Sequence, residues 1–401
     1  MTRQSTDILI SGGGVAGLAA AAVFGSAGFS VLCVDPAPPI VEEQAEGADL
    51  RTTAFLQPSL KVLQEAGLWD RLSPYATDLQ VMRIVDAGGT TPAPRVVRDF
   101  NARDVSDLPF GWNLPNWLLR REMVARLDEL PNVAFRTGVG TKSVLTRDVE
   151  ALVTLTDGTR VSAKMLVAAD GRNSPVREAV GIGVRTIRYG QKALAFAVAH
   201  PEPHGNVSTE IHRSGGPFTL VPLPDRDGKP CSAIVWMERG PEALRLANMP
   251  EAEFNAEMTA RSGAILGPLT LVTRRTIWPI ISQNGDSFCA ERTALIAEAA
   301  HVVPPIGAQG LNMSLADLRV LLELSRAAPA AIGSERMLEI YNRRRRPEVL
   351  ARLTGIDLLN RTSMRGERIA RDLRAAGIAG LYSLGPVRKT LMRAGMGVRL
   401  A

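Results

Sequence analysis

The feature that most constrains this chain is a stretch without charged residues, from Ile8 to Val34, that glycines interrupt. Its length and hydrophobicity alone would suggest a membrane span. The glycines stand at Gly12, Gly13, Gly14, Gly17, Gly25 and Gly28. Because a glycine-rich turn divides an apolar stretch into shorter pieces, we predict instead a buried strand, a turn, a buried helix and a second strand.

The spacing Gly12-x-Gly14-x-x-Gly17 between a strand and a helix is typical of a dinucleotide cradle. The first glycine permits the tight turn, the second lets backbone approach a pyrophosphate, and the third lets the helix pack closely on the strand. Free N–H groups at the helix start favour phosphate. Asp35 ends the second strand, at the spacing of an acid that binds ribose hydroxyls. The alternative is a glycine turn without ligand, and this motif alone does not separate FAD from NAD.

Composition limits the class of protein. The 401 residues suggest two lobes, and the 45% hydrophobic and 22% charged content is that of a folded protein. Basic residues exceed acidic ones by 47 − 41 = 6, which indicates a generic soluble surface or attraction to anionic lipids or acidic substrates. Nucleic acid is not expected, because no aromatic platform is interleaved with the basic residues. Cys33, Cys231 and Cys289 predict buried free thiols and no metal site. We expect no signal peptide and a cytoplasmic protein.

Beyond about Gly181 the pattern changes. The segments 193–199, 218–223 and 232–236 alternate between apolar and polar residues, which predicts an antiparallel sheet up to about Ile277. Past Glu335 the sequence predicts Arg-rich helices. One of them contains Arg361, Arg365, Arg368, Arg371 and Arg374, with Met364, Ile369 and Leu373 between them. A basic amphipathic helix of this kind packs as an ordinary tail or lies on a membrane surface.

Two later segments follow predicted buried strands. Strand 164–169 leads into the segment from Asp170 to Arg177, which reads DGRNSPVR; taken alone, Asp-Gly is a common turn. Strand 294–297 ends at Glu298, and a Pro/Gly loop then leads into a helix from about Leu311. The start of that helix offers backbone N–H groups to an anion or a polarised ring.

Together, these three motifs resemble those of the single-component flavin-dependent aromatic hydroxylases. The resemblance implies that the first motif binds the ADP half of FAD and that Asp170-Gly171 lies near the pyrophosphate. It implies that Glu298 holds the ribityl chain, that residues 307–312 lie against the flavin ring, and that the backbones of Pro305 and Gly307 lie nearest to the reaction. The implied cofactor-binding residues are Gly12, Gly14, Val15, Ala16, Gly17, Asp35, Arg51, Arg120, Asp170, Gly171, Glu298, Gly307, Gln309, Gly310, Leu311 and Asn312.

Two features depart from the family pattern. Ala297-Glu298 replaces the usual Gly-Asp, which adds a methyl group and a longer acid. The loop PPIGAQG, residues 304–310, is closer to that of hydroxybenzoate hydroxylase. Other segments resemble the ubiquinone-biosynthesis branch of the family. They are Asp49-x-Arg51, Tyr189-Gly190-Gln191, residues 216–223 and residues 384–397. In that branch the arginine of the first segment reaches FAD.

The resemblance implies an α/β fold, in which a Rossmann-like FAD-binding domain carries an inserted β-sheet substrate domain and C-terminal helices, as in hydroxybenzoate hydroxylase. We expect the FAD-binding domain in residues 1–75, 105–180 and 278–350. The β-rich substrate domain is expected in 76–104 and 181–277, and a C-terminal helical segment in 351–401.

The implied activity is hydroxylation of the ring of a (poly)prenylated phenol in ubiquinone biosynthesis. Reduced FAD would react with molecular oxygen to give a C4a-hydroperoxide that the ring attacks, and NAD(P)H or another electron donor would reduce the flavin. The site must exclude water, which would otherwise release peroxide. Because the substrate derives from the membrane, a peripheral place at the inner membrane face or in a ubiquinone-biosynthesis complex is open for this cytoplasmic protein, and so is a homo-oligomer.

Three alternatives remain open. A hydroxylase of a soluble aromatic acid would place an Arg in the pocket to clamp the carboxylate, and Arg213 is the candidate. A flavin-dependent isoprenoid reductase would consume reductant without oxygen. A non-catalytic flavin-bound subunit would not reoxidise its flavin when a phenol is supplied. His301 is either a base or, in our interpretation, a structural residue.

Overall fold

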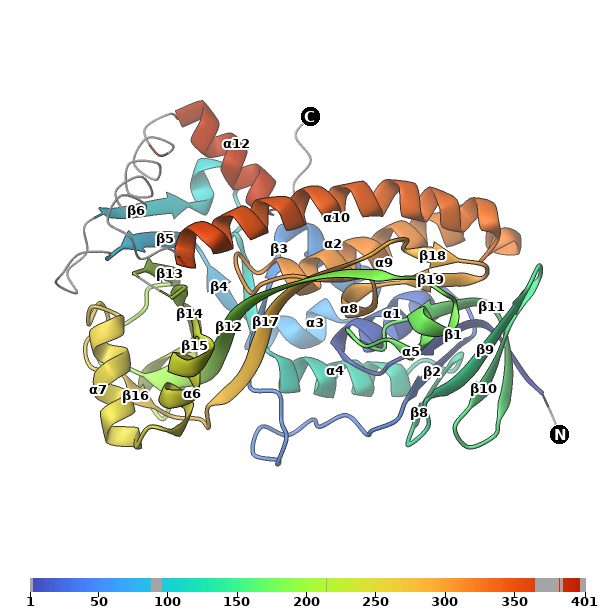
Figure 1. Ribbon diagram of the computed structural model, residues 1–401, viewed down its shortest axis with the longest axis horizontal. Helices are drawn as coiled ribbons and strands as arrows, with labels where there is room; N and C mark the ends of the chain where they lie inside the picture. The colour runs from blue at the N-terminus through green and yellow to red at the C-terminus, as the bar shows by residue number, and fades with distance from the viewer. Residues whose placement is uncertain (1–2, 88–95, 214, 365–381, 383–384, 397–401) are drawn as a thin grey trace.

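The computed structural model describes residues 3–87, 96–213, 215–364, 382 and 385–396. Its first sheet has eight strands, and its centre is the parallel series β19-β11-β1-β2-β8. The antiparallel strand β18 adds one edge, and the hairpin of β9 and β10 extends from β11 (Figure 1). The strands are β1 (Gln4–Ser11), β2 (Val31–Asp35), β8 (Val133–Thr137), β9 (Thr141–Arg147), β10 (Glu150–Leu155), β11 (Arg160–Ala168), β18 (Cys289–Ala290) and β19 (Thr293–Leu295).

The uncharged stretch near the N-terminus forms β1, α1 (Val15–Ser26) and β2, as the glycines predicted. Ile8, Leu9 and Ile10 are fully buried, because helices or loops cover both faces of this parallel sheet. Helix α1 is buried from Gly17 to Gly25, which explains its hydrophobicity on all sides. Nowhere in the described ranges does a helix combine the length and the apolar character that crossing a bilayer requires.

The strand predicted over residues 294–297 is wrong at its C-terminal end. Strand β19 ends at Leu295, and Ala297 begins the short helix α8 (Ala297–Ala300), so Glu298 lies in a helix. The apolar residues of this segment are buried whether they belong to a strand or a helix, and the sequence pattern did not distinguish the two.

The second sheet has nine strands in the order β20-β17-β12-β15-β14-β13-β5-β6, with β16 paired to β12. All its pairings are antiparallel except that of β13 with β5. Its strands are β5 (Val81–Asp86), β6 (Val96–Asn101), β12 (Val184–Ala199), β13 (Val207–His212), β14 (Pro217–Arg226), β15 (Lys229–Arg239), β16 (Thr270–Leu271), β17 (Thr276–Gly285) and β20 (His301–Val302). The antiparallel sheet predicted beyond residue 181 is therefore present.

One face of the second sheet packs on two helices, α6 (Gly240–Asn248) and α7 (Glu251–Arg261), at the lower left of Figure 1. Phe218 and Trp236 lie on that face and contact one another, and Trp236 also contacts Phe254 of α7. Because successive side chains of a strand point to opposite faces, their neighbours Thr219 and Val235 point the other way, into the cavity described below.

The remaining elements join the two sheets. A small antiparallel sheet contains β3 (Thr52–Leu56), β7 (Gly111–Pro115) and β4 (Thr77–Leu79). The other helices are α2 (Gln57–Glu65), α3 (Trp69–Leu72), α4 (Asn116–Asp128), α5 (Pro175–Ala179), α9 (Gln309–Ala327), α10 (Glu335–Met364) and α12 (Gly385–Met396), with short 3-10 turns η1 (Ser73–Tyr75), η2 (Ala102–Asp104) and η3 (Pro329–Ala331).

Helix α10 spans both sheets along the top of Figure 1. Near its start, Tyr341 Oη donates to the carbonyl of Leu295 in β19 at 2.7 Å, and near its end Asp357 accepts from Tyr189 of β12 at 2.7 Å. The helix continues through position 350/351, where we placed a domain boundary; the division into domains stays a prediction. The basic repeat predicted beyond Met364 lies outside the described residues.

All three cysteines are free. Cys33 and Cys231 are buried as predicted. The prediction was wrong for Cys289, which is only partly buried because it lies in the edge strand β18.

Candidate functional site

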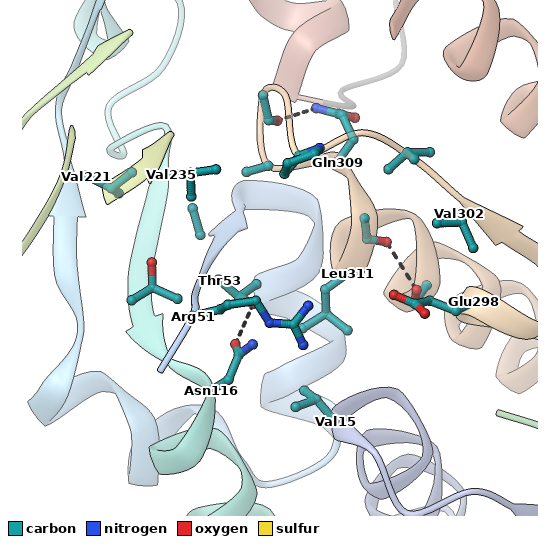
Figure 2. A pocket seen from close by; sticks show the side chains of 18 of the residues that line it. Val15, Arg51, Thr53, Asn116, Val221, Val235, Glu298, Val302, Gln309 and Leu311 are labelled. Carbon is teal, nitrogen blue, oxygen red and sulfur yellow. Dashed lines mark hydrogen bonds between the residues drawn. The ribbon is translucent and has the colours of Figure 1, made fainter. Parts of the chain in front are cut away.

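A cavity of about 490 Å³ lies between the two sheets. We call its first side the loop wall, formed by Gly14, Val15, Ala16, Ala169, Gly171, Arg172, Ala297, Glu298, Gly307, Ala308, Gln309, Gly310 and Leu311. Its second side, the sheet wall, is formed by Ser208, Glu210, Thr219, Val221, Val235, Trp278 and Ile280. Figure 2 shows Val221 and Val235 on one side of the pocket, Glu298 and Val302 on the other, and Arg51 and Leu311 between them.

The glycine turn at the start of α1 leaves no room for a side chain at Gly12 or Gly17 but has open space at Gly14. A Cβ on Gly12 would lie 2.4 Å from the carbonyl oxygen of Ala169, and one on Gly17 would lie 1.8 Å from that of Gly12. Gly14 differs, because a Cβ there would meet no atom within 4 Å. Gly14 is also the N-cap of α1, which has no side-chain cap, so its first N–H groups are available to an anion.

Asp35 holds this turn from behind. Its Oδ2 accepts from the N–H of Gly13 at 2.6 Å and its Oδ1 from the N–H of Ala37 at 2.9 Å. Asp35 lies beside the turn but does not line the cavity. Contact with a ribose stays a prediction.

A cluster of polar residues fixes Arg51 in the cavity. Arg51 donates from Nε and Nη2 to the two carboxylate oxygens of Asp49, each at 2.7 Å. Asn116 donates to Asp49 at 3.0 Å. It accepts from Thr53 at 2.8 Å (Figure 2). Burial raises the pKa of Asp49, but the hydrogen bonds and charge of Arg51 hold it below its usual value. The Arg51 guanidinium also lies 5.4 Å from the ring centroid of Trp278, so it is held from two sides.

Ala297 adopts a backbone conformation that favours glycine, with φ of 53°. This is the position at which the family pattern has Gly, so the substitution places a methyl group where L-residues are strained. The next residue, Glu298, pairs with Arg172 at 3.1 Å and has a side chain that is 46% exposed. Glu298 lines the cavity, and its contact with a ribityl chain stays a prediction.

The two residues of the Asp-Gly turn after β11 differ in their position relative to the cavity. Gly171 lines the cavity, whereas Asp170 lies behind it and accepts from the N–H of Val176 at 3.1 Å. Burial raises the pKa of the Asp170 carboxyl. The residue thus supports the start of α5.

The loop before α9 turns sharply at two residues with positive φ, Gly307 at 63° and Ala308 at 55°. Gln309 then donates to the carbonyls of Gly307 at 2.7 Å and Gly395 at 3.1 Å, which ties the loop to α12. Asn312 does not line the cavity. Its side chain bonds the carbonyls of Ala54 and Ala308, the N–H of Leu56 and the hydroxyl of Ser59.

His301 belongs to a buried ionic network. Its Nε2 lies 2.8 Å from Oδ2 of Asp317, whose Oδ1 accepts from Arg345 at 2.8 Å. Burial raises the pKa of Asp317, but the neighbouring His301 and Arg345 more than offset it and hold the pKa below its usual value. The network joins α9 to α10, and His301 also lines the cavity. The buried pairing with Asp317 supports the structural interpretation of His301.

The structure therefore brings most of the predicted site residues to one cavity. Those that line it are Gly14, Val15, Ala16, Arg51, Arg120, Gly171, Glu298, Pro305, Gly307, Gln309, Gly310 and Leu311. Those that lie behind its walls are Gly12, Gly17, Asp35, Asp170 and Asn312. Their assignment to individual parts of a cofactor stays a prediction.

Comparison with known proteins identifies the family. The family described as FAD binding domain matches residues 5–354. The chain belongs to this family. FAD is therefore its cofactor, which the first glycine motif alone could not distinguish from NAD.

The relatives include ubiquinone hydroxylase UbiL of Rhodospirillum rubrum, which is 33% identical over 98% of this chain and 89% of that protein. The 3-demethoxyubiquinol 3-hydroxylase of Escherichia coli is 26% identical over 99% and 100% of the two chains. Among solved structures, p-nitrophenol 4-monooxygenase PnpA from Pseudomonas putida matches with a TM-score of 0.79 at 20% identity, over 99% and 100% of the two chains. These findings confirm the predicted fold and the resemblance to the ubiquinone-biosynthesis branch.

The residues present fit FAD. The uncapped start of α1 and the open side of Gly14 suit a pyrophosphate. Arg120 lines the cavity, and within the described ranges its buried Nε has no hydrogen-bond partner, so it is free to donate to the cofactor.

The sequence reasoning missed the polar residues of β13. Ser208 and Glu210 line the cavity, and His212 pairs with Glu210 at 2.8 Å. The signal was present, because Ser208, Glu210 and His212 alternate with Thr209 and Ile211, which is the period of a strand with one polar face.

Proposed function

We propose that the protein is an FAD-dependent enzyme that hydroxylates the aromatic ring of a prenylated phenol in ubiquinone biosynthesis. The sheet wall carries this proposal. Val221, Val235 and Ile280 line it with aliphatic side chains, and Thr219 and Trp278 add a hydroxyl and an aromatic face. Such a surface suits a ring with an apolar tail. The names of the two ubiquinone-pathway relatives support the same substrate class.

The charges of the cavity argue against an aromatic acid as substrate. Arg213, the candidate clamp for a carboxylate, is not among the lining residues. Within the described ranges the lining arginines are Arg51, Arg120 and Arg172. Asp49 is paired to Arg51 and Arg120, and Glu298 is paired to Arg172. The charged residue of the sheet wall is an acid, Glu210, which would repel a carboxylate.

When bound, reduced FAD activates molecular oxygen for transfer of one oxygen atom to the ring, with NAD(P)H or another donor as the source of electrons. We assign Gly14, Val15 and Ala16 to the pyrophosphate and Glu298 to the ribityl chain. Pro305 and Gly307 also line the cavity, and we assign to their prolyl and backbone groups the exclusion of water.

We also propose that the prenyl tail is taken from a membrane surface. Leu358 and Leu359 near the end of α10 are 64% and 55% exposed, and Leu391 of α12 is 47% exposed. Arg361 and Lys389 lie on the same two helices, as a surface for anionic lipid requires. Flotation with vesicles that contain phosphatidylglycerol should recover the protein, whereas phosphatidylcholine vesicles should not. If neither kind of vesicle recovered the protein, this placement at the membrane would be contradicted.

The substrate class is tested with FAD-loaded protein, chemically reduced so that the natural electron donor need not be known. The reduced enzyme is mixed with ¹⁸O₂ and either a prenylated phenol or 4-hydroxybenzoate. We expect one ¹⁸O atom in the prenylated product and none in the acid. Label in the acid alone would indicate a hydroxylase of soluble aromatic acids instead. Reduction of an isoprenoid double bond without oxygen uptake would indicate an isoprenoid reductase. A flavin that the phenol does not help to reoxidise would indicate a non-catalytic subunit.

A further inference from the structure

Strand β13 presents a carboxylate to the cavity. Its side chains alternate, so that Ile211 packs in the core beneath α6 and α7 while Ser208 and Glu210 line the cavity on the opposite face. Thr219 of β14 is the residue paired with Glu210, and it lines the same wall. An acid in a wall that otherwise exposes aliphatic side chains costs stability unless it is compensated.

Two buried side chains, His212 and Ser363, follow one another behind this carboxylate. Oε1 of Glu210 lies 2.8 Å from Nε2 of His212, and Nδ1 of His212 lies 3.1 Å from the hydroxyl of Ser363 in α10. The Ser363 hydroxyl also donates to the carbonyl of Leu359 at 2.9 Å. His212 and Ser363 are 8% and 3% exposed. Oε1 is thus in ion-pair distance of His212, and the Glu210 side chain lines the cavity.

We propose that Glu210 is a catalytic residue that accepts the proton of the substrate's ring hydroxyl, and that His212 and Ser363 position it. This inference rests on the proposed function. A ring that takes up an oxygen atom develops positive charge, which spreads to a hydroxyl group on the ring and makes its proton acidic. A carboxylate oriented toward that hydroxyl accepts the proton as it is released.

The step is a proton transfer and needs no further reactant. The O–H bond of the substrate breaks, an O–H bond forms on Glu210, and the electron pair of the broken bond stays on the substrate oxygen. That oxygen becomes a carbonyl for as long as the ring is not aromatic. The proton on the new C–O carbon then passes to solvent water, the C–H electron pair restores the aromatic ring, and Glu210 returns its proton to the oxygen.

The test compares wild type with Glu210→Gln, which keeps the shape and removes the basic oxygen. The exposed residue Glu253 on α7 supplies a matched control, Glu253→Gln. We expect Glu210→Gln to bind FAD and to be reduced as wild type is, but to form product about 100-fold more slowly in a single turnover. It should release the lost oxygen as hydrogen peroxide. The control should equal wild type.

A substrate with its ring hydroxyl methylated separates catalysis from structure, because it has no proton to transfer. On this analogue wild type and Glu210→Gln should have equal rates. His212→Ala should lose about 10-fold on the hydroxyl substrate, and His212→Gln, whose amide can donate to Glu210, should recover part of that loss. Neither change should alter the rate on the methylated analogue.

Each outcome is decisive. A wild-type rate for Glu210→Gln on the hydroxyl substrate, or equal losses on both substrates, would overturn the role of Glu210 and leave the proposed function intact. If wild type hydroxylates no prenylated phenol, the proposed function fails, and the inference fails with it.

Discussion

Gly14→Ala separates the folding role of the glycine turn from its binding role. Gly14 has φ of −68° and ψ of 176°, which alanine also adopts, and a Cβ there would meet no protein atom within 4 Å. Loss of glycine at an N-cap costs about 0.5 kcal/mol, and the reduced freedom of the unfolded chain returns about as much. The free energy of unfolding of the apoprotein should therefore change by less than about 1 kcal/mol.

The cofactor should respond differently. The added methyl group occupies the space through which a pyrophosphate would approach the start of α1. Loss of one charge-assisted hydrogen bond costs about 1.5–3 kcal/mol, so the Kd for FAD should rise roughly 10- to 100-fold. Gly17→Ala is the contrasting variant, because its Cβ would lie 1.8 Å from the carbonyl oxygen of Gly12. That clash forces α1 to shift and should cost about 3 kcal/mol of stability without any ligand.

The assay pairs urea unfolding of the apoproteins with titration of FAD, followed by quenching of flavin fluorescence. A wild-type Kd for Gly14→Ala would refute the reasoning, because the phosphates would then not approach the turn at Gly14. A strongly destabilised Gly14→Ala apoprotein would equally refute the claim that this glycine is kept for the ligand.

Three further predictions concern other parts of the site. Asp317→Asn should lower the free energy of unfolding by about 3–5 kcal/mol, because Arg345 keeps its charge and loses a buried partner. The pKa of Asp317 is lower in the folded than in the unfolded protein. The ionised carboxylate therefore stabilises the fold fully above the unfolded pKa of about 3.9, and this stabilisation is lost as the pH falls through the folded pKa. The urea midpoint of wild type should fall over that acid range, and the variant should lack the part of the fall that comes from Asp317. Ala297→Gly should raise the free energy of unfolding by up to about 1 kcal/mol, because glycine adopts a positive φ without strain. The control Ala299→Gly, inside α8, should lower it by about 1 kcal/mol. Equal shifts of the melting temperature for the two variants would show that the backbone at Ala297 is not strained. Arg213→Ala should leave the KM for a prenylated phenol unchanged, and a large rise in KM would return this residue to the pocket.

Much of the site was predictable because its motifs are local. The turn from Gly12 to Gly17, the acid at Asp35 and the loop at residues 304–310 each lie within a few residues of the strand or helix end that they serve. The arginine cluster shows the limit of such reasoning. Asp49-x-Arg51 is visible in the sequence, but Asn116, which completes the cluster, comes from α4 and is brought there by the pairing of β3 with β7.

By itself the sequence determined the strand, glycine turn, helix and strand near the N-terminus and the antiparallel sheet beyond residue 181. The spacing of glycines sets the permitted backbone angles, and the alternation of apolar residues sets which strands are buried on one face or on both. Only the tertiary structure decided which side chains meet in the cavity. Glu210 and Ser363 stand 153 positions apart, and His212 joins them only because α10 crosses the second sheet at β13. Arg213 lies just beyond the end of β13 and does not line the cavity. Within β13, Glu210 lines the cavity and Ile211 points to the opposite face, and the packing decides which face encloses the substrate.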